Sequence, residues 1–188
     1  ISRQLVDRTE AERLLLEQAR LRRQLKRAID LYQPEVFFTL IKQVSPEDQF
    51  NFTRAILSQA VQRFDQDLIE LLVKKELITP TEVTDELLLN QAFELAQAFI
   101  ESGYAPSQNA EIMAAMNLNL PVLEYLNDIG INPSLDGANQ AILAQPSFLQ
   151  PPKTVLDQID VLDWYRQQGI NPTEGSSSPE ILDWLERH

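Results

Sequence analysis

Few residues of this chain have side chains that could act as a nucleophile or hold a transition metal. The 188 residues contain no Cys, and the one His, His188, is the last residue. Ser-His-Asp and Cys-His sites need a His inside the fold, and the usual zinc sites need His and Cys ligands. The five glycines are isolated, so no phosphate-binding loop is present, and residues 132–137 offer too few oxygen ligands for a calcium loop. The sequence therefore predicts no metal and no cofactor.

Carboxylates are the remaining groups that could do acid–base chemistry. Glu82, Asp85 and Glu86 recur at helical spacing, as do Asp160 and Asp163. Two converging carboxylates are sufficient for glycoside hydrolysis. Pairs at this spacing are also common on the solvated faces of helices, so we expect a protein that is not an enzyme and keep a carboxylate-based enzyme as an alternative.

The elements that must position these side chains are predicted to be helices almost throughout. In residues 3–31, apolar residues recur at helical spacing among Arg and Glu, which predicts one long amphipathic helix that packs on the rest of the chain or extends as a coiled-coil arm. Those apolar residues are Leu14, Leu15, Leu21, Leu25, Ala28 and Ile29. Further helices are predicted over residues 35–44, 46–64, 65–75 and 87–101. No segment alternates polar and apolar residues between turns, so we expect almost no β-strand.

Helix starts and stops follow a pattern that recurs along the chain. Ser45 before Pro46 and Thr79 before Pro80 suit an N-cap followed by the first helical turn. Helix stops followed by Pro begin at residues 77, 103, 130 and 169. In the last three a Gly can adopt the left-handed conformation that ends a helix, and the Pro prevents the helix from continuing. Short apolar blocks also recur, at residues 122–126, 161–165 and 181–185, with a looser copy at 68–72.

Around the stop at residue 130 these features form a longer pattern. Its residues are Ala114-Ala115, Val122-Leu123, Leu126, Gly130-Ile131-Asn132-Pro133, Asp136-Gly137 and Ala144. Residues 107–137 resemble the ankyrin repeat family. By this resemblance Ala114-Ala115 are the small residues of the first helix, Val122-Leu123 and Leu126 are apolar residues of the second, and residues 130–133 are the helix stop. Asp136-Gly137 would then be the tip of the inter-repeat turn, and Ala144 the small position of the next helix. Residues 139–142 stand where the family has Thr-Pro-Leu-His, and residues 145–152 are an insertion, so the resemblance is to degenerate repeats.

The resemblance implies a fold of stacked helical hairpins, a solenoid in which each unit buries its apolar face against its neighbours. Residues 65–188 would form the ankyrin-like repeats. Residues 1–64 would form an N-terminal helical segment that caps them, as a separate part or as one continuous domain. Trp164 and Trp184 each follow an apolar pair and are expected in the core. The alternative is an irregular all-α helical bundle.

Charge is distributed unevenly along the chain. The formal net charge is −12, yet residues 1–30 contain eight basic and five acidic side chains, a charge of +3. Residues 76–152 contain ten acids and no Lys or Arg. Such a surface repels phosphate backbones, so direct nucleic-acid binding is not expected. No apolar run reaches the ~18–20 residues of a membrane-spanning helix, so no membrane insertion is expected.

These features predict a non-catalytic protein–protein interaction module or scaffold with an acidic helical-repeat surface and a basic protein partner. The repeated stops carry polar insertions on one side, and the candidate contact residues come from them. They are Tyr104, Asn132, Leu135, Asp136, Asn171 and Glu174. The alternatives are an acidic decoy that occupies a nucleic-acid-binding protein and the carboxylate-based enzyme.

The remaining expectations concern origin and location. The chain has 18 Gln residues, which is compatible with a bacterial protein. The absence of a secretory signal pattern predicts a cytoplasmic or intracellular protein, including one delivered into a host cell. The identity of the partner, the organism and the oligomeric state are left open by the sequence.

Overall fold

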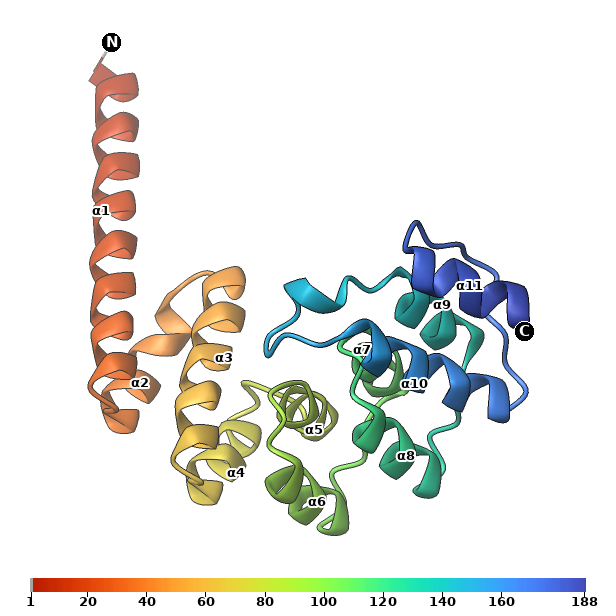
Figure 1. Cartoon of the computed structure of the whole chain (residues 1–188). Coiled ribbons are helices and arrows are strands. Elements are labelled where there is room, and N and C mark those ends of the chain that lie inside the picture. The colour runs from red at the N-terminus through yellow and green to blue at the C-terminus, as the bar shows by residue number, and fades with distance from the viewer. Residues whose placement is uncertain (1) are drawn as a thin grey trace. The chain divides into compact units, whose positions relative to one another are not determined.

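The computed structural model describes residues 2–188, with all side chains except those of residues 2, 5 and 6. Within this range it contains eleven α-helices, two short 3-10 helices and no strand (Figure 1). The prediction of an all-α protein is confirmed. Contacts divide the chain into two compact units, residues 1–79 and residues 80–188. The predicted boundary after residue 64 falls inside the first of these units.

The first unit is built from four helices and one 3-10 turn. They are α1 (Ser2–Asp30), α2 (Pro34–Leu40), η1 (Ile41–Gln43), α3 (Pro46–Gln62) and α4 (Gln66–Lys74). Helix α1 packs on α2 and α3, and α3 packs on α4, around Leu25, Phe37, Ile56 and Ile69, which are all buried. Because α3 and α4 are packed together, the two sides of the predicted boundary belong to one core.

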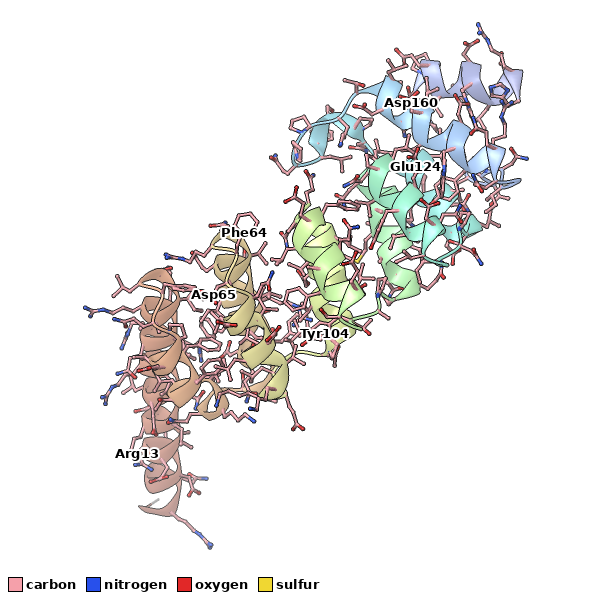
Figure 2. All side chains as sticks on the ribbon, turned by 90° about the horizontal axis from the view of Figure 1, so that it is seen from below. Arg13, Phe64, Asp65, Tyr104, Glu124 and Asp160 are labelled. Atoms are coloured by element: carbon pink, nitrogen blue, oxygen red, sulfur yellow. The ribbon has the colours of Figure 1, made fainter. Side chains whose placement is uncertain are left out.

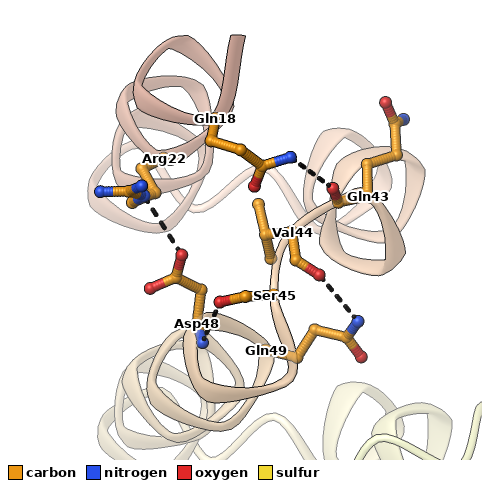
Figure 3. Close-up of polar contacts among 7 residues, drawn as sticks. All are labelled: Gln18, Arg22, Gln43, Val44, Ser45, Asp48 and Gln49. Atoms are coloured by element: carbon orange, nitrogen blue, oxygen red, sulfur yellow. Dashed lines mark hydrogen bonds and ion pairs between the residues drawn. The ribbon is translucent and has the colours of Figure 1, made fainter. Parts of the chain in front are cut away.

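Helix α1 packs through its C-terminal half only. Leu21 and Leu25 are buried, whereas residues 7–17 are exposed, including the predicted apolar-face residues Leu14 and Leu15. The predicted long helix is confirmed. Its apolar face is covered only from Leu21 onward, because α2, η1 and α3 do not extend far enough to cover Leu14 and Leu15. Packing ends near Gln18 (Figure 3), whose Nε2 donates to the backbone oxygen of Gln43 at 3.2 Å.

The predicted cap of α3 is confirmed. The Ser45 hydroxyl accepts a hydrogen bond from the backbone N–H of Asp48 at 3.2 Å (Figure 3). The Asp48 carboxylate in turn forms an ion pair with Arg22 of α1, with 3.2 Å between Nε and Oδ2. The start of α3 is therefore fixed both by its own cap and by its neighbour α1.

The second unit contains seven α-helices. They are α5 (Pro80–Leu89), α6 (Phe93–Glu101), α7 (Gln108–Met116), α8 (Leu120–Asp128), α9 (Leu135–Leu143), α10 (Val155–Gln167) and α11 (Pro179–Arg187), with η2 (Pro146–Phe148) between α9 and α10. Helix α7 packs on α5, α8 and α9, and α10 packs on α8, α9 and α11. Helices α6 and α8 meet where the Phe93 and Tyr125 rings are edge-to-face at 4.9 Å. Trp164 and Trp184 are buried, as predicted.

The predicted helix over residues 87–101 is wrong, because two helices occupy this range. Helix α5 ends at Leu89 and α6 begins at Phe93. At the break Gln91 has a φ of 60°, and its N–H and that of Ala92 bond back to the carbonyls of Leu88 and Leu87. The turn contains neither Gly nor Pro, and the apolar pattern continues through it, so the sequence gives no sign that the helix ends here.

Helix ends of one type recur in both units. Gly103, Gly130 and Gly169 have φ values of 102°, 97° and 80°, which confirms the predicted left-handed caps. Five other helix ends use the same turn without glycine, with the positive-φ residues Tyr32, Phe64, Glu76, Gln91 and Leu118.

Gly137, in contrast, was predicted at the tip of an inter-repeat turn, and this is wrong. It lies in the first turn of α9 and is buried.

Candidate protein-interaction surface

The three Gly-containing connections of the second unit are each fastened to an earlier helix by a polar side chain. In the first, Asp85 of α5 accepts hydrogen bonds from Ser107, with its backbone N at 3.0 Å and its Oγ at 2.5 Å. Ser107 is the residue before α7, so this contact joins α5 to the start of α7. One member of the predicted acidic cluster around residue 85 therefore has a structural role.

The second connection is held by the buried carboxylate of Glu111, which is 1% exposed. Glu111 accepts from the Ser134 backbone N at 3.0 Å, from Ser134 Oγ at 2.8 Å and from the Tyr165 hydroxyl at 2.5 Å. Burial and the hydrogen bond to Glu111 raise the pKa of Tyr165 well above its ordinary value. This cluster joins α7, α9 and α10, and its residues are not among the site residues predicted from the sequence.

The third connection is held by an amide. Oδ1 of Asn139, on α9, accepts from the backbone N of Thr173 at 2.8 Å and from that of Glu174 at 3.2 Å. Its Nδ2 donates to Thr173 Oγ1 at 3.1 Å. In each of the three connections the fastened residue is the Ser or Thr that follows Gly-x-x-Pro. That position in the recurring pattern could have pointed to these contacts.

Five of the six predicted contact residues are exposed: Asn132, Leu135, Asp136, Asn171 and Glu174. They occupy the second and third connections and the first turn of α9. The backbone of two of them is fixed, because Gln108 donates to the Asn132 carbonyl at 3.0 Å and Asn139 holds Glu174. The backbone is therefore held by a side chain at two of the five residues.

The sixth predicted contact residue, Tyr104, is half-buried. Its ring lies 5.0 Å from that of Phe99, and its carbonyl accepts a hydrogen bond from Thr84 Oγ1 at 2.8 Å. Much of the Tyr104 side chain therefore packs against the end of α6. Only its remaining exposed part could contact a partner.

The predicted carboxylates have different surroundings in the structure. Asp163 accepts from the indole Nε1 of Trp184 at 2.7 Å, while Asp160 is exposed. The cavity beside Asp85, of about 10 Å³, has no second carboxylate in its lining. No group of three or more His, Cys, Asp or Glu side chains among the described residues could hold a metal ion.

The charge of the molecule is concentrated in the second unit. Residues 80–188 contain sixteen acidic and three basic side chains, a net charge of −13, whereas residues 1–79 contain twelve acidic and thirteen basic, a net charge of +1. The long stretch without Lys or Arg accounts for most of this difference. The charge asymmetry that the sequence shows is therefore a difference between two folded units.

Five acids, which we call the outer acids, lie exposed on three helices of the second unit. They are Glu94 and Glu101 of α6, Glu124 and Asp128 of α8, and Asp160 of α10 (Figure 2 labels Glu124 and Asp160). None of them forms an ion pair within the described part of the chain. Burial, and after it the negative charge of Glu101, raise the pKa of the Tyr125 hydroxyl.

No protein-family model, no curated protein and no solved structure matches this chain. None of the described helices is long and apolar enough to cross a membrane.

Proposed function

We propose that the protein is a non-catalytic protein–protein interaction module whose second unit binds a basic protein through the outer acids. The observation that carries this proposal is the net charge of −13 in residues 80–188, with five acids exposed on helices that have no cation of their own except Arg166 of α10. A surface of this kind attracts a basic partner from a distance and rejects acidic ones.

The internal polar groups of the same unit support a binding role rather than a catalytic one. Asp85, Glu111 and Asn139 are engaged by hydrogen bonds from their own chain, which fix the three connections. The outer acids take no part in these contacts. Rigid internal polar contacts beneath a charged exterior suit a scaffold that presents the same surface to each partner.

The degenerate ankyrin-like solenoid belongs to this proposal. Its support is that the connection Gly-x-x-Pro-Ser/Thr recurs three times, each time fastened to an earlier helix, and that α5, α7 and α9 pack on one another in order. In this arrangement the exposed residues Asn132, Leu135, Asp136, Asn171 and Glu174 would form a second contact region along the connections.

The test is to capture partners with the full chain and with two charge-reversed variants, and to identify them by mass spectrometry. Glu124→Lys with Asp128→Lys alters the outer acids, and Asp136→Lys with Glu174→Lys alters the connections. A partner retained by the wild type should be basic, and it should be lost on reversing the outer acids. Glu47→Lys, an exposed acid of the first unit, is the matched control. Retention of the same partners by all variants would contradict the proposal.

A second candidate is the acidic decoy, in which the partner is a nucleic-acid-binding protein whose basic surface the outer acids occupy. The same concentration of negative charge favours it, because a surface of this sign competes with a phosphate backbone. A captured partner should then release DNA or RNA when the chain is added, and this release should weaken as salt is raised. A partner that binds the chain and a nucleic acid simultaneously would exclude the decoy.

A further inference from the structure

A groove in the first unit combines an apolar floor with an acidic rim. It lies between α2 and α4 and has a volume of about 590 Å³. Its apolar lining includes Val36 and Leu71, which are 43% and 36% exposed, next to the buried Leu68. Exposed aliphatic side chains around a concavity of this size can accept an apolar side chain from another molecule.

The rim of the groove carries three carboxylates and no cation. They belong to Glu35, Asp65 and Asp67. The Asp65 carboxylate, labelled in Figure 2, already has two partners. It accepts a hydrogen bond from the Tyr32 hydroxyl at 2.5 Å and caps α4 by accepting one from the Leu68 N–H at 3.1 Å. Glu35 and Asp67 are exposed, and their carboxylates form no ion pair with the described residues. The groove therefore fits an apolar side chain that has two cations near it on the same surface.

A solvent-exposed face of α1 presents this combination. Leu16 is 72% exposed, and Arg20 and Arg23 follow it at i+4 and i+7, so the three side chains share one helix face. Both arginines are exposed, and neither forms an ion pair with the described residues. This face of α1 has no partner of its own within the first unit.

The groove of the same molecule is out of reach for Leu16. Helix α1 is continuous, so Leu16 lies about 22 Å along the helix from Leu31, at the turn that leads into the groove. An isolated helical extension without packing is also marginally stable in water, so contact with another molecule would stabilise it.

We infer that the groove between α2 and α4 binds the Leu16–Arg20–Arg23 face of α1 from a second copy of the chain. Leu16 enters between Val36 and Leu71, and the two arginines face Glu35 and Asp67. If both copies make the contact, a two-fold dimer closes; if only one does, the contact builds open chains. This self-association uses only the first unit and goes beyond the proposed function of the second.

The experiment uses two complementary variants of the full chain, measured by analytical ultracentrifugation over a wide concentration range. The groove variant carries Glu35→Arg and Asp67→Arg, and the helix variant carries Arg20→Glu and Arg23→Glu. We expect the wild type to associate, more weakly at high salt, and each variant alone to associate at least on the order of tenfold more weakly. The mixture of the two variants should associate again, because each groove then meets an α1 of opposite charge.

Four further measurements keep the result interpretable. Circular dichroism verifies that each variant is folded, and Leu16→Asn, at an exposed position, tests the apolar contact without changing charge. Glu70→Arg changes an acid of α4 that does not line the groove, and Glu124→Lys with Asp128→Lys changes the outer acids. These two should associate as the wild type does.

The proposal is overturned by a wild type that stays at the 21.5 kDa mass of one chain, by a variant mixture that stays monomeric, or by loss of association on changing the outer acids. The last result would place the binding site for α1 in the second unit.

Discussion

At the scale of single residues, the burial of the Glu111 carboxylate is possible because neighbouring groups donate hydrogen bonds to it. A buried charge without hydrogen bonds is costly, and Glu111 receives three, from two groups of Ser134 and from Tyr165. Gly137 lies directly against this cluster, and the position of any Cβ there would overlap the Glu111 carboxylate and the Tyr165 hydroxyl. The absence of a side chain at residue 137 is therefore a condition for the cluster.

We expect Gly137→Ala to lower the free energy of unfolding by about 1–3 kcal/mol, because the methyl group must displace buried atoms in a packed core. Urea unfolding followed by tryptophan fluorescence measures the change. Gly175→Ala is the matched control, since a Cβ at residue 175 meets open space and should change stability by less than about 0.5 kcal/mol. Equal effects of the two substitutions would contradict the crowding at residue 137.

Because of Tyr165, we expect the folded protein to become less stable at alkaline pH. Its pKa is raised in the folded state by burial and by Glu111, so it keeps its proton where the unfolded chain loses it. The ionisation of Tyr165 therefore leaves the free energy of unfolding unchanged below the ordinary tyrosine pKa of about 10. Above that pH it lowers the free energy of unfolding by up to about 1.4 kcal/mol per pH unit. Tyr165→Phe should remove this share of the slope. Urea unfolding of both proteins between about pH 9 and 11 tests it, and identical slopes would contradict the prediction.

At the scale of elements, the helix ends differ in the residue that takes the left-handed conformation. Gly103 adopts it without a steric penalty, whereas Gln91 adopts it with a φ of 60° although it has a side chain. Both positions lie on the surface, and a Cβ at Gly103 would meet nothing. The two ends can therefore be compared through their backbone strain alone.

We expect Gly103→Ala to destabilise the second unit by about 1 kcal/mol and Gln91→Gly to stabilise it by up to about 1 kcal/mol. The strain is introduced in the first variant and removed in the second. Thermal and urea unfolding measure both. Effects of the same sign would show that something other than left-handed strain controls these turns.

At the scale of the whole molecule, the two units differ in charge and in their spectroscopic probes. The second unit has a net charge of −13 and contains Trp164 and Trp184, the two tryptophans of the chain. Like charges on one compact unit repel each other and lower its stability. Tryptophan fluorescence reports on this unit, whereas circular dichroism reports on helices of both.

Raising the salt concentration should therefore raise the fluorescence-detected melting temperature of the second unit by a few degrees, roughly the effect of 1 kcal/mol. Glu124→Lys with Asp128→Lys should raise the same midpoint at low salt and reduce its salt response. A midpoint that does not change with salt in the wild type would show that repulsion among the acids is negligible.

The sequence predicted the elements well where local chemistry marks them. Ser45 and the glycines at 103, 130 and 169 were recognised because capping and left-handed turns depend on a few neighbouring residues. The break at Gln91 was missed because an ordinary side chain adopts the left-handed conformation there. The candidate contact residues stay predictions; five of them are exposed and Tyr104 is half-buried.

Composition and periodicity by themselves determined the all-α class, the buried tryptophans and the uneven charge, because these depend on residue type and on spacing along one helix. Only the tertiary structure decided which acids are buried and hydrogen-bonded and which stay exposed to water. Glu111 and Glu124 are the same residue type on neighbouring helices, yet one is buried among three donors and the other faces water. That difference depends on distant residues such as Ser134 and Tyr165, whose contact with Glu111 no local pattern encodes.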